Sequence, residues 1–201
     1  MKKRLLSTLV LGLVACAPAS VEPTAGGAQA GCMTRAYSEI GGPISLIDQT
    51  GARITEADLK GSHTLVFFGF TYCPDICPMT LFTIGQAIEQ LPDDIAPPRT
   101  VLISVDPERD TPEALSIYLS NDAFPAGALG LTGTPEEIKA AADVFRAGFQ
   151  RVNTPESLAD YTMDHTSLVY LMDEAWSLQT FFTHSADATT MADCLVQHLD
   201  S

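Results

Sequence analysis

From residue 32 onward, short apolar runs alternate with segments in which apolar residues recur every three to four positions. Alternating residues at 43–47, turn residues at 48–51 and a return at 52–54 predict a β-hairpin. Continuous apolar runs predict strands covered on both faces, and shorter runs predict less buried ones. The predicted strands after the hairpin span residues 64–70, 99–105, 128–131, 167–172 and 177–183.

Helical periodicity fills the segments between these strands. The predicted helices run over 77–91, from a cap at Asp110 or Thr111 to Leu119, from a cap at Thr134 to Phe145, and over 187–199. Alternating strands and helices predict an α/β fold with a mostly parallel sheet, helices on both faces and an antiparallel edge. Sites in such sheets lie at the carboxyl ends of strands, where we expect the loops 71–78 and 106–112 to open side by side.

The first fifteen residues have the pattern of a secretory signal. Basic residues at 2–4 precede an apolar run at 5–15 that is too short to cross a bilayer as a mature helix. The run ends in Leu13-Val14-Ala15-Cys16, which resembles the bacterial lipobox, so we expect residues 1–15 to be removed and Cys16 to carry a lipid. The alternative is an ordinary signal cut after the alanine-rich stretch, with Cys16 discarded.

Residues 16–31 are rich in Ala and Gly, with Pro, Ser, Thr and Gln and one Glu, which predicts a flexible tether. Residues 32–201 show no repeat and no second linker and are predicted to form one domain. The chain has 11 basic and 25 acidic residues, a net charge of −14, and loss of the three basic residues of the signal would make it −17. Such a chain repels the phosphates that dominate nucleic-acid affinity, which excludes DNA and RNA as partners.

Cys73 and Cys77 lie in a predicted strand-to-helix turn. Thiols near a helix N-terminus lose their protons more easily, and thiolates are both nucleophiles and soft metal ligands. A spacing of four lets the two sulfurs meet at one metal ion or join in a disulfide, so the pair alone indicates either metal binding or redox exchange. A passive structural disulfide is the third interpretation, against which the location in a tight turn argues.

Three segments together resemble the Sco/SenC family of copper chaperones. The stretch FGFTYCPDICP at 68–78 is similar to the family signature, DPERDTP at 106–112 to its second loop, and YTMDHT at 161–166 to the segment with its histidine ligand. The resemblance spans nearly the whole domain. It implies a thioredoxin-like fold with a mixed central sheet, helices on both faces and an N-terminal β-hairpin, and copper held by Cys73, Cys77 and His165.

Two thiolates and one imidazole suit Cu(I), a soft ion that three ligands satisfy, whereas Cu(II) would need a further ligand. Asp106, at the end of its strand, is the candidate for contacting the metal ligands without binding the metal, or for binding the metal transiently. Asp164 is the candidate for orienting the imidazole of His165, or else is a turn residue before a strand. Met79 is interpreted as core filling rather than as a ligand.

The remaining cysteines and histidines lie outside the family signature. Cys194 and His198 are one helical turn apart, a spacing that can bind metal, but apolar neighbours on the same face favour core packing. Cys32 stands at the opposite end of the domain from Cys194, and in an oxidising compartment we hypothesise a disulfide between them. His63 and His184 have no supporting neighbours and are interpreted as structural.

The lipobox and the resemblance together predict a membrane-anchored copper chaperone that faces the periplasm in the bacterial cell envelope. Its expected role is to deliver copper to, or prepare the cysteines of, the binuclear copper centre of cytochrome c oxidase, with the copper-bearing subunit and other periplasmic copper carriers as partners. A thiol-disulfide oxidoreductase acting through Cys73 and Cys77 is the enzyme alternative, and a copper-responsive redox sensor is the third. A peroxiredoxin-like peroxidase is excluded, because its reactive Cys follows Thr or Ser by three positions, where this chain has Phe70 and Pro74.

Overall fold

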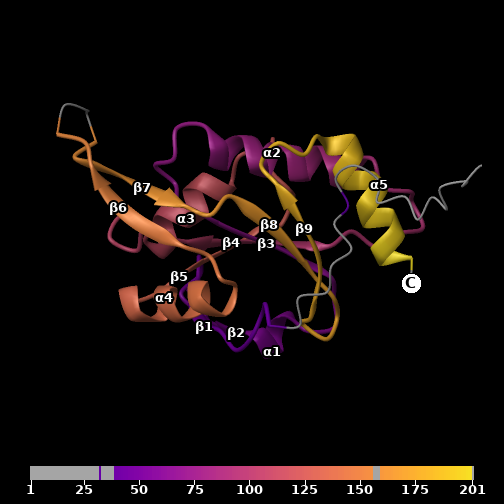
Figure 1. Cartoon of the computed structure of the whole chain (residues 1–201), viewed down its shortest axis with the longest axis horizontal. Coiled ribbons are helices and arrows are strands. Elements are labelled where there is room, and N and C mark those ends of the chain that lie inside the picture. The colour runs from indigo at the N-terminus through magenta and orange to yellow at the C-terminus, as the bar shows by residue number, and fades with distance from the viewer. Residues whose placement is uncertain (1–31, 33–38, 156–158, 201) are drawn as a thin grey trace, which may run out of the picture.

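A computed structural model describes residues 32, 39–155 and 159–200 (Figure 1). The predicted signal and the whole of the predicted tether, including Cys16, lie outside the described residues. None of the helices in the described part of the chain has the length and apolarity needed to cross a membrane.

A seven-stranded sheet forms the centre of the domain, in the order β2-β1-β5-β4-β3-β8-β9. Its strands are β1 (Ser45–Asp48), β2 (Arg53–Thr55), β3 (Thr64–Gly69), β4 (Arg99–Ser104), β5 (Leu129–Thr132), β8 (Leu168–Met172) and β9 (Leu178–Thr183). Only β3 with β4 and β4 with β5 pair in parallel, and the other neighbours are antiparallel. The prediction of a mostly parallel sheet is therefore wrong, because the N-terminal hairpin joins the same sheet antiparallel to β5, whereas the mixed sheet that the family resemblance implied is confirmed.

Helices cover both faces of this sheet (Figure 1). They are α1 (Glu56–Leu59), α2 (Ile76–Glu89), α3 (Pro112–Leu119), α4 (Pro135–Val144) and α5 (Ala188–Leu199). Successive residues of a strand point to opposite faces. Gly69 of β3 faces Cys77 of α2, whereas the ring of Phe68 packs edge-on against Phe145 at the end of α4, 5.5 Å between centroids. The fully buried β3 thus lies between a helical layer that contains α2 and another that contains α4.

The predicted helices begin at side chains that accept hydrogen bonds from otherwise unpaired backbone amides. Thr111 caps α3, Thr134 caps α4 in a reciprocal arrangement with Glu137, and Asp187 caps α5. Of the two caps considered for α3, the structure selects Thr111, which leaves the carboxylate of Asp110 available for other contacts.

A second, two-stranded sheet was not predicted. It consists of β6 (Phe149–Asn153) and β7 (Tyr161–His165), which pair antiparallel and project from the domain at the left of Figure 1. Most residues of β6 are exposed, so the segment shows no apolar run. His165 lies just before β8, as expected, and it also ends β7, which places its side chain at the base of this hairpin. The short α1 was also missed, since four residues give no helical period.

Candidate metal centre

Three side chains from separate elements converge at the carboxyl end of β3. Cys73 lies in the loop after β3, Cys77 in the first turn of α2, and His165 at the end of β7. Their ligating atoms, two sulfurs and one ring nitrogen, all lie within 4.8 Å of one another. The structure therefore brings together the three residues that the resemblance named, although His165 stands far from the two cysteines along the chain.

The loop between β3 and α2 directs both thiols toward one point. The amide of Cys73 donates to the carbonyl of Phe70 at 3.2 Å, which turns the chain immediately after the strand. The amide of Cys77 donates to Sγ of Cys73 at 3.3 Å. Unpaired amides in the first turn of a helix carry partial positive charge, so this contact favours the thiolate form of Cys73.

Close packing fixes the second thiol. Cys77 is fully buried, and a methyl group added at Gly69 would come within 3.0 Å of its Sγ. A side chain larger than hydrogen at position 69 would push the sulfur out of place. Cys73 is only half-buried, so the two thiols of the pair differ in their access to solvent.

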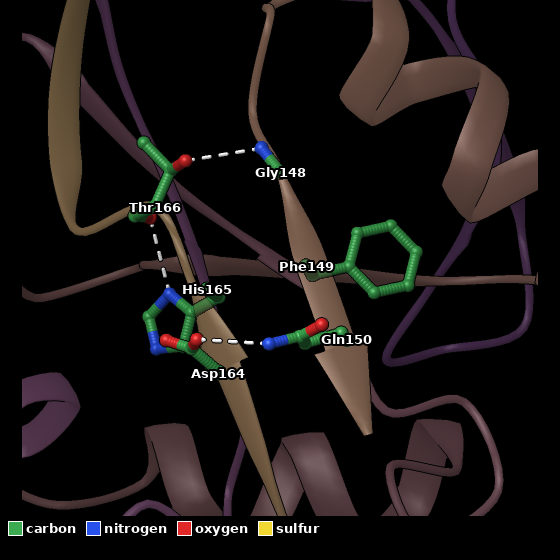
Figure 2. Close-up of a pocket in the computed structure, with 6 residues that line it drawn as sticks. All are labelled: Gly148, Phe149, Gln150, Asp164, His165 and Thr166. Carbon is green, nitrogen blue, oxygen red and sulfur yellow. Dashed lines mark hydrogen bonds between the residues drawn. The ribbon is translucent and has the colours of Figure 1, made fainter. Parts of the chain in front are cut away.

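The imidazole of His165 presents its Nε2 atom to the sulfurs. Nε2 lies 3.5 Å from Sγ of Cys77, and Nδ1 lies 3.1 Å from the carbonyl oxygen of Thr166 (Figure 2). A carbonyl can only accept, so Nδ1 carries the proton in the neutral ring and Nε2 keeps its lone pair. The rings of Phe67 and Phe70 contact the imidazole edge-on and hold its plane. The ring is thus oriented for coordination through Nε2.

The two thiols differ strongly in acidity. The hydrogen bond from the Cys77 thiol lowers the pKa of Cys73 to about 4, although burial acts in the opposite direction. The hydrogen bond with Cys73 and burial raise the pKa of Cys77. Without a metal the pair therefore shares one proton, which resides on Cys77, and Cys73 is a thiolate at neutral pH.

The two acidic residues considered as supports for the ligands have other partners. Asp106 is buried and accepts hydrogen bonds from Nε of Arg109 and from the hydroxyl of Tyr161. Asp164 is exposed and accepts from the side-chain amide of Gln150 at 3.2 Å. Asp164 was a candidate for the orienting contact on Nδ1 of His165, with a turn residue as the alternative. That contact is made by the backbone carbonyl described above, because the side chain of a strand residue points to the opposite face from its neighbour.

Sequence reasoning missed Asp110 and Arg109, which hold the loops around the site. The buried carboxylate of Asp110 accepts from the amide and hydroxyl of Thr71 and from the hydroxyl of Ser104, which ties the cysteine loop to the end of β4. Burial raises the pKa of Asp110. The guanidinium of Arg109 lies between the rings of Tyr72 and Tyr161, 4.6 and 3.7 Å from their centroids. The sequence signal that could have identified Asp110 and Arg109 was their position in the loop at 106–112.

Two hollows adjoin the site. A cleft of about 230 Å³ exposes Cys73 and His165 together with Pro74, Asp75 and Met163. A neighbouring hollow of about 440 Å³ is lined by 148–150 and 164–166, the residues drawn in Figure 2. The cleft gives a partner's side chain access to the half-buried sulfur and to the imidazole, whereas Cys77 does not line it.

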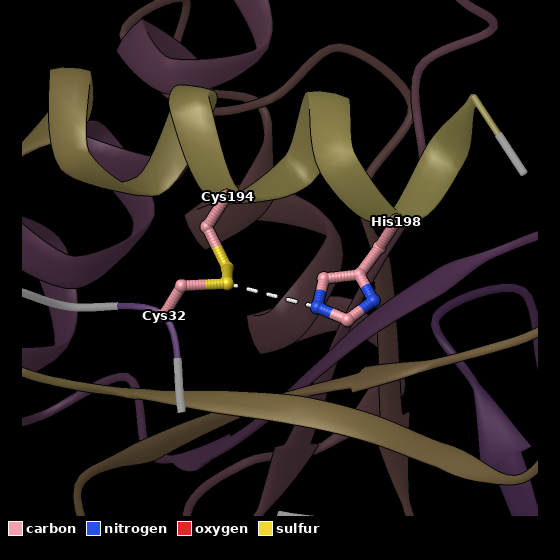
Figure 3. A group of neighbouring side chains, drawn as sticks. All are labelled: Cys32, Cys194 and His198. Carbon is pink, nitrogen blue, oxygen red and sulfur yellow. Dashed lines mark hydrogen bonds between the residues drawn. A yellow bond between two sulfur atoms is a disulfide. The ribbon is translucent and has the colours of Figure 1, made fainter. Parts of the chain in front are cut away.

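Met79 and the cysteines outside the signature do not belong to this site. Met79 is 53% exposed, so its interpretation as core filling is wrong, and its side chain lies on the solvent-facing side of α2. Cys32 and Cys194 form a disulfide, as hypothesised (Figure 3). Their sulfurs are therefore not thiolates in this form, and His198 beside them packs near a bonded pair.

The donor set of Cys73, Cys77 and His165 fits a soft metal ion. Bonds of about 2.0–2.3 Å, as zinc makes to imidazole and thiolate, would put the ligand atoms of a three-coordinate site about 3.5–4 Å apart. The observed distance of 3.5 Å between Cys77 Sγ and His165 Nε2 lies within that range. Thiolate ligands favour Cu(I) over hard cations, and the buried side of the site excludes the water that octahedral ions retain.

Comparison with known proteins places these features in a family. A sequence model described as SCO1/SenC matches residues 33–200. The chain is 40% identical over 164 residues to "Protein SCO1 homolog 1, mitochondrial" of Arabidopsis thaliana. That match covers 80% of this chain and 47% of the relative, so the chain spans about half the length of that protein.

Two solved structures agree in fold. Arabidopsis thaliana ScoI with copper bound has a TM-score of 0.75 and 38% identity, and the match covers 80% of this chain and 98% of that chain. Bradyrhizobium japonicum ScoI with copper bound has a TM-score of 0.70 and 41% identity, over 80% of this chain and 99% of that chain. Both similarities span the described domain, and both neighbours carry copper.

Proposed function

The chain belongs to the SCO1/SenC family, and on that premise we propose that it is an extracytoplasmic copper-binding chaperone. Its cargo is copper, held by Cys73, Cys77 and His165. Its role is to supply the binuclear copper centre of cytochrome c oxidase, with the copper-bearing subunit of that enzyme as recipient. The carrying observation is the convergence of two sulfurs and the lone pair of an imidazole within 4.8 Å.

The site is suited to Cu(I). Binding of Cu(I) replaces the proton that Cys73 and Cys77 share, so one proton leaves and the dithiolate keeps a single negative charge after the cation enters. The neutral imidazole adds a third ligand without further charge. Cys77, buried and rigidly packed, holds the metal from below, and Cys73 and His165 hold it at the rim of the cleft.

Transfer proceeds by ligand exchange at that rim. A recipient's sulfur or imidazole enters the cleft and bonds to copper as Cys73 or His165 dissociates from it, so that copper always keeps at least two ligands. Cys77 is expected to leave last because it is fully buried. Such stepwise exchange needs no redox change of the metal.

The second candidate function is reduction of the recipient's cysteines, favoured by the acidity of Cys73. A thiolate with a pKa of about 4 attacks a partner's disulfide and forms a mixed disulfide; Cys77 then loses its proton and attacks Cys73. The products are the partner's dithiol and a Cys73–Cys77 disulfide in this chain. Two electrons pass to the partner, and a reductant must restore the pair.

The location in the cell envelope is part of the proposal. A signal at residues 1–15 and a lipid on Cys16 would anchor the chain to a membrane with the domain facing the periplasm. The predicted tether at 16–31 would let the domain reach a membrane-bound oxidase. Mass spectrometry of the membrane-extracted chain tests it: a diacylglyceryl Cys16 at the N-terminus is expected, and an unmodified N-terminus beyond residue 16 would contradict it.

Anaerobic titration with Cu(I) tests the main proposal. The chain from residue 16 onward, with Cys16→Ser and with the Cys32–Cys194 disulfide intact, should bind one copper and lose two free thiols as it does so. The matched variant with Cys73→Ser and Cys77→Ser should bind none. A chain that retains two reactive thiols at saturating copper would overturn the proposed site. If that chain binds no copper and yet reduces a disulfide substrate, the result would favour the second candidate.

A further inference from the structure

A second group of two cysteines and a histidine lies outside the signature. Cys32 is disulfide-bonded to Cys194 of α5, and His198 follows Cys194 by one helical turn (Figure 3). Nε2 of His198 lies 3.6 Å from Sγ of Cys32. The two sulfurs and the ring nitrogen all lie within 4.8 Å of one another.

This group repeats the donor set of the proposed copper site. Among the described residues, only these two groups bring three Cys, His or acidic ligand atoms together and include a sulfur pair. The closest sulfur-to-nitrogen distances are also similar, 3.5 Å in the first group and 3.6 Å in the second. The difference between them is the oxidation state of the sulfurs, because Cys73 and Cys77 are free thiols.

A disulfide sulfur lacks the anionic lone pair that makes a thiolate a strong ligand for soft metals. We propose that Cys32, Cys194 and His198 form a second Cu(I) site that exists only when their disulfide is reduced. A dithiol reductant opens the bond: the two sulfurs gain two electrons and two protons, and the reductant becomes a disulfide. Cu(I) then displaces both protons and binds the two thiolates and the imidazole nitrogen.

The backbone already holds these residues at a suitable separation. The Cα atoms of Cys32 and Cys194 lie 5.4 Å apart, so rotation of the two side chains alone separates the sulfurs enough to admit an ion between them. Cys32 and Cys194 are 4% and 1% exposed, so two thiolates there need a cation.

The sulfurs of Cys32 and Cys194 can therefore either form a disulfide or bind copper, but not both at once. A copper ion held there would be buried and would not reach a recipient, in contrast to copper at the cleft beside Cys73. The disulfide therefore keeps the metal at the site from which it can be passed on. A chain that meets copper before this disulfide forms would bind two ions rather than one.

The test uses the chain from residue 16 onward with Cys16, Cys73 and Cys77 all replaced by Ser, so that only the second sulfur pair remains. This background makes the result independent of the proposed chaperone site. The oxidised and the anaerobically reduced forms are each titrated with Cu(I) against a chromophoric Cu(I) chelator. We expect no copper in the oxidised form, and one copper per chain with two thiols consumed in the reduced form.

Two matched variants in the same background identify the ligands. Adding Cys194→Ser should abolish binding in the reduced form. Adding His198→Ala should weaken it at least about tenfold and remove the nitrogen ligand from the copper X-ray absorption spectrum. Equal affinity and an unchanged spectrum in the His198→Ala variant would overturn the site as described.

Reduction could also loosen the fold, so near-ultraviolet circular dichroism is recorded with each titration. Recovery of the folded signal on addition of one Cu(I) supports the proposal, since a ligand that binds only the folded form stabilises it. A reduced chain that remains folded, has two free thiols and binds no copper would overturn it. So would a chain that unfolds on reduction and does not refold with copper.

Discussion

The guanidinium carbon of Arg109 lies 3.7 Å from the ring centroid of Tyr161, and the two side chains meet at the same buried carboxylate, that of Asp106. A second hydrogen bond runs from Nη1 of Arg109 to the backbone carbonyl of Tyr161 at 3.1 Å. Tyr161 begins β7 and His165 ends it. The second loop thus fastens the strand that carries the imidazole, which makes Asp106 a support of the hairpin.

Arg109→Ala should lower the free energy of unfolding by about 2–4 kcal/mol, because it leaves the carboxylate of Asp106 buried without its cation. Urea unfolding measures this. The same variant should bind Cu(I) less tightly, since β7 loses its anchor at Tyr161. The control is Lys139→Ala, which breaks an ion pair exposed by more than 60% on both sides and should cost no more than about 0.5 kcal/mol. Equal stability of the two variants would contradict the role of Arg109.

His165→Ala should weaken Cu(I) binding at least about tenfold while leaving disulfide exchange by Cys73 and Cys77 largely intact, because exchange needs only the sulfurs. Competition with a Cu(I) chelator measures the first quantity, and the rate of reduction of a dithiol-specific reporter measures the second. His63→Ala is the matched control, since that histidine directly precedes β3, whereas the site lies at the carboxyl end of the same strand. An unaltered copper affinity in His165→Ala would count against a three-ligand site.

Most of the central sheet could be predicted because its strands are buried. All six residues of β3 are buried, and such a run of apolar residues has few alternatives to a covered strand. The helices were predicted where apolar spacing agreed with a capping residue, as at Thr134. The parallel or antiparallel sense of each pairing was not predictable in the same way, since it depends on where the hairpin of β1 and β2 joins the sheet.

The hairpin of β6 and β7 illustrates what local pattern leaves out. Its strands bury little surface, so burial gives no signal in β6, although Tyr161 and Met163 alternate with polar neighbours in β7 and could have indicated a strand. The contact between Asp110 and Thr71 joins positions 39 residues apart. Pairings of that kind are set by the fold, and no spacing along the chain reveals them.

Asp110→Ala should destabilise the domain by about 2–4 kcal/mol, because the amide and hydroxyl of Thr71 and the hydroxyl of Ser104 lose their acceptor. Asp110→Asn keeps one acceptor oxygen and should cost less. Burial raises the pKa of Asp110 above its unfolded value of 3.8, so ionisation costs the folded state stability as pH rises through that interval.

The free energy of unfolding of Asp110→Asn, relative to the original chain, should therefore improve as pH rises from below 4 and then level off once the folded-state carboxyl has ionised. Chemical unfolding of both chains across that range measures it. A difference that does not change with pH would mean that Asp110 titrates as an ordinary carboxyl. A thiol count on each sample excludes effects of oxidation at the neighbouring cysteine loop.

The reactivity of Cys73 should follow its low pKa. The thiolate, not the thiol, reacts with iodoacetamide, and a pKa of about 4 means that Cys73 is already ionised at pH 5. The alkylation rate of the reduced, metal-free chain should therefore stay nearly constant from pH 8 to 5 and fall only near pH 4. Cys77, which is buried and has a raised pKa, should remain unmodified throughout.

The same shift predicts the stability of the reduced form. The folded-state pKa of Cys73 lies below the ordinary thiol value of 9.0, so its contribution to stability is lost as pH falls from about 9 toward about 4, whereas above pH 9 the raised pKa of Cys77 lowers the stability of the reduced form. Cys77→Ala should raise the pKa of Cys73, because it removes the thiol that donates to the thiolate. Mass spectrometry of peptides alkylated across the pH range, with the urea-denatured chain as reference, measures the pKa of Cys73 in the original chain and in the variant. A rate that falls near pH 8 to 9 in the folded chain, as in the denatured one, would contradict the shared-proton arrangement of the pair.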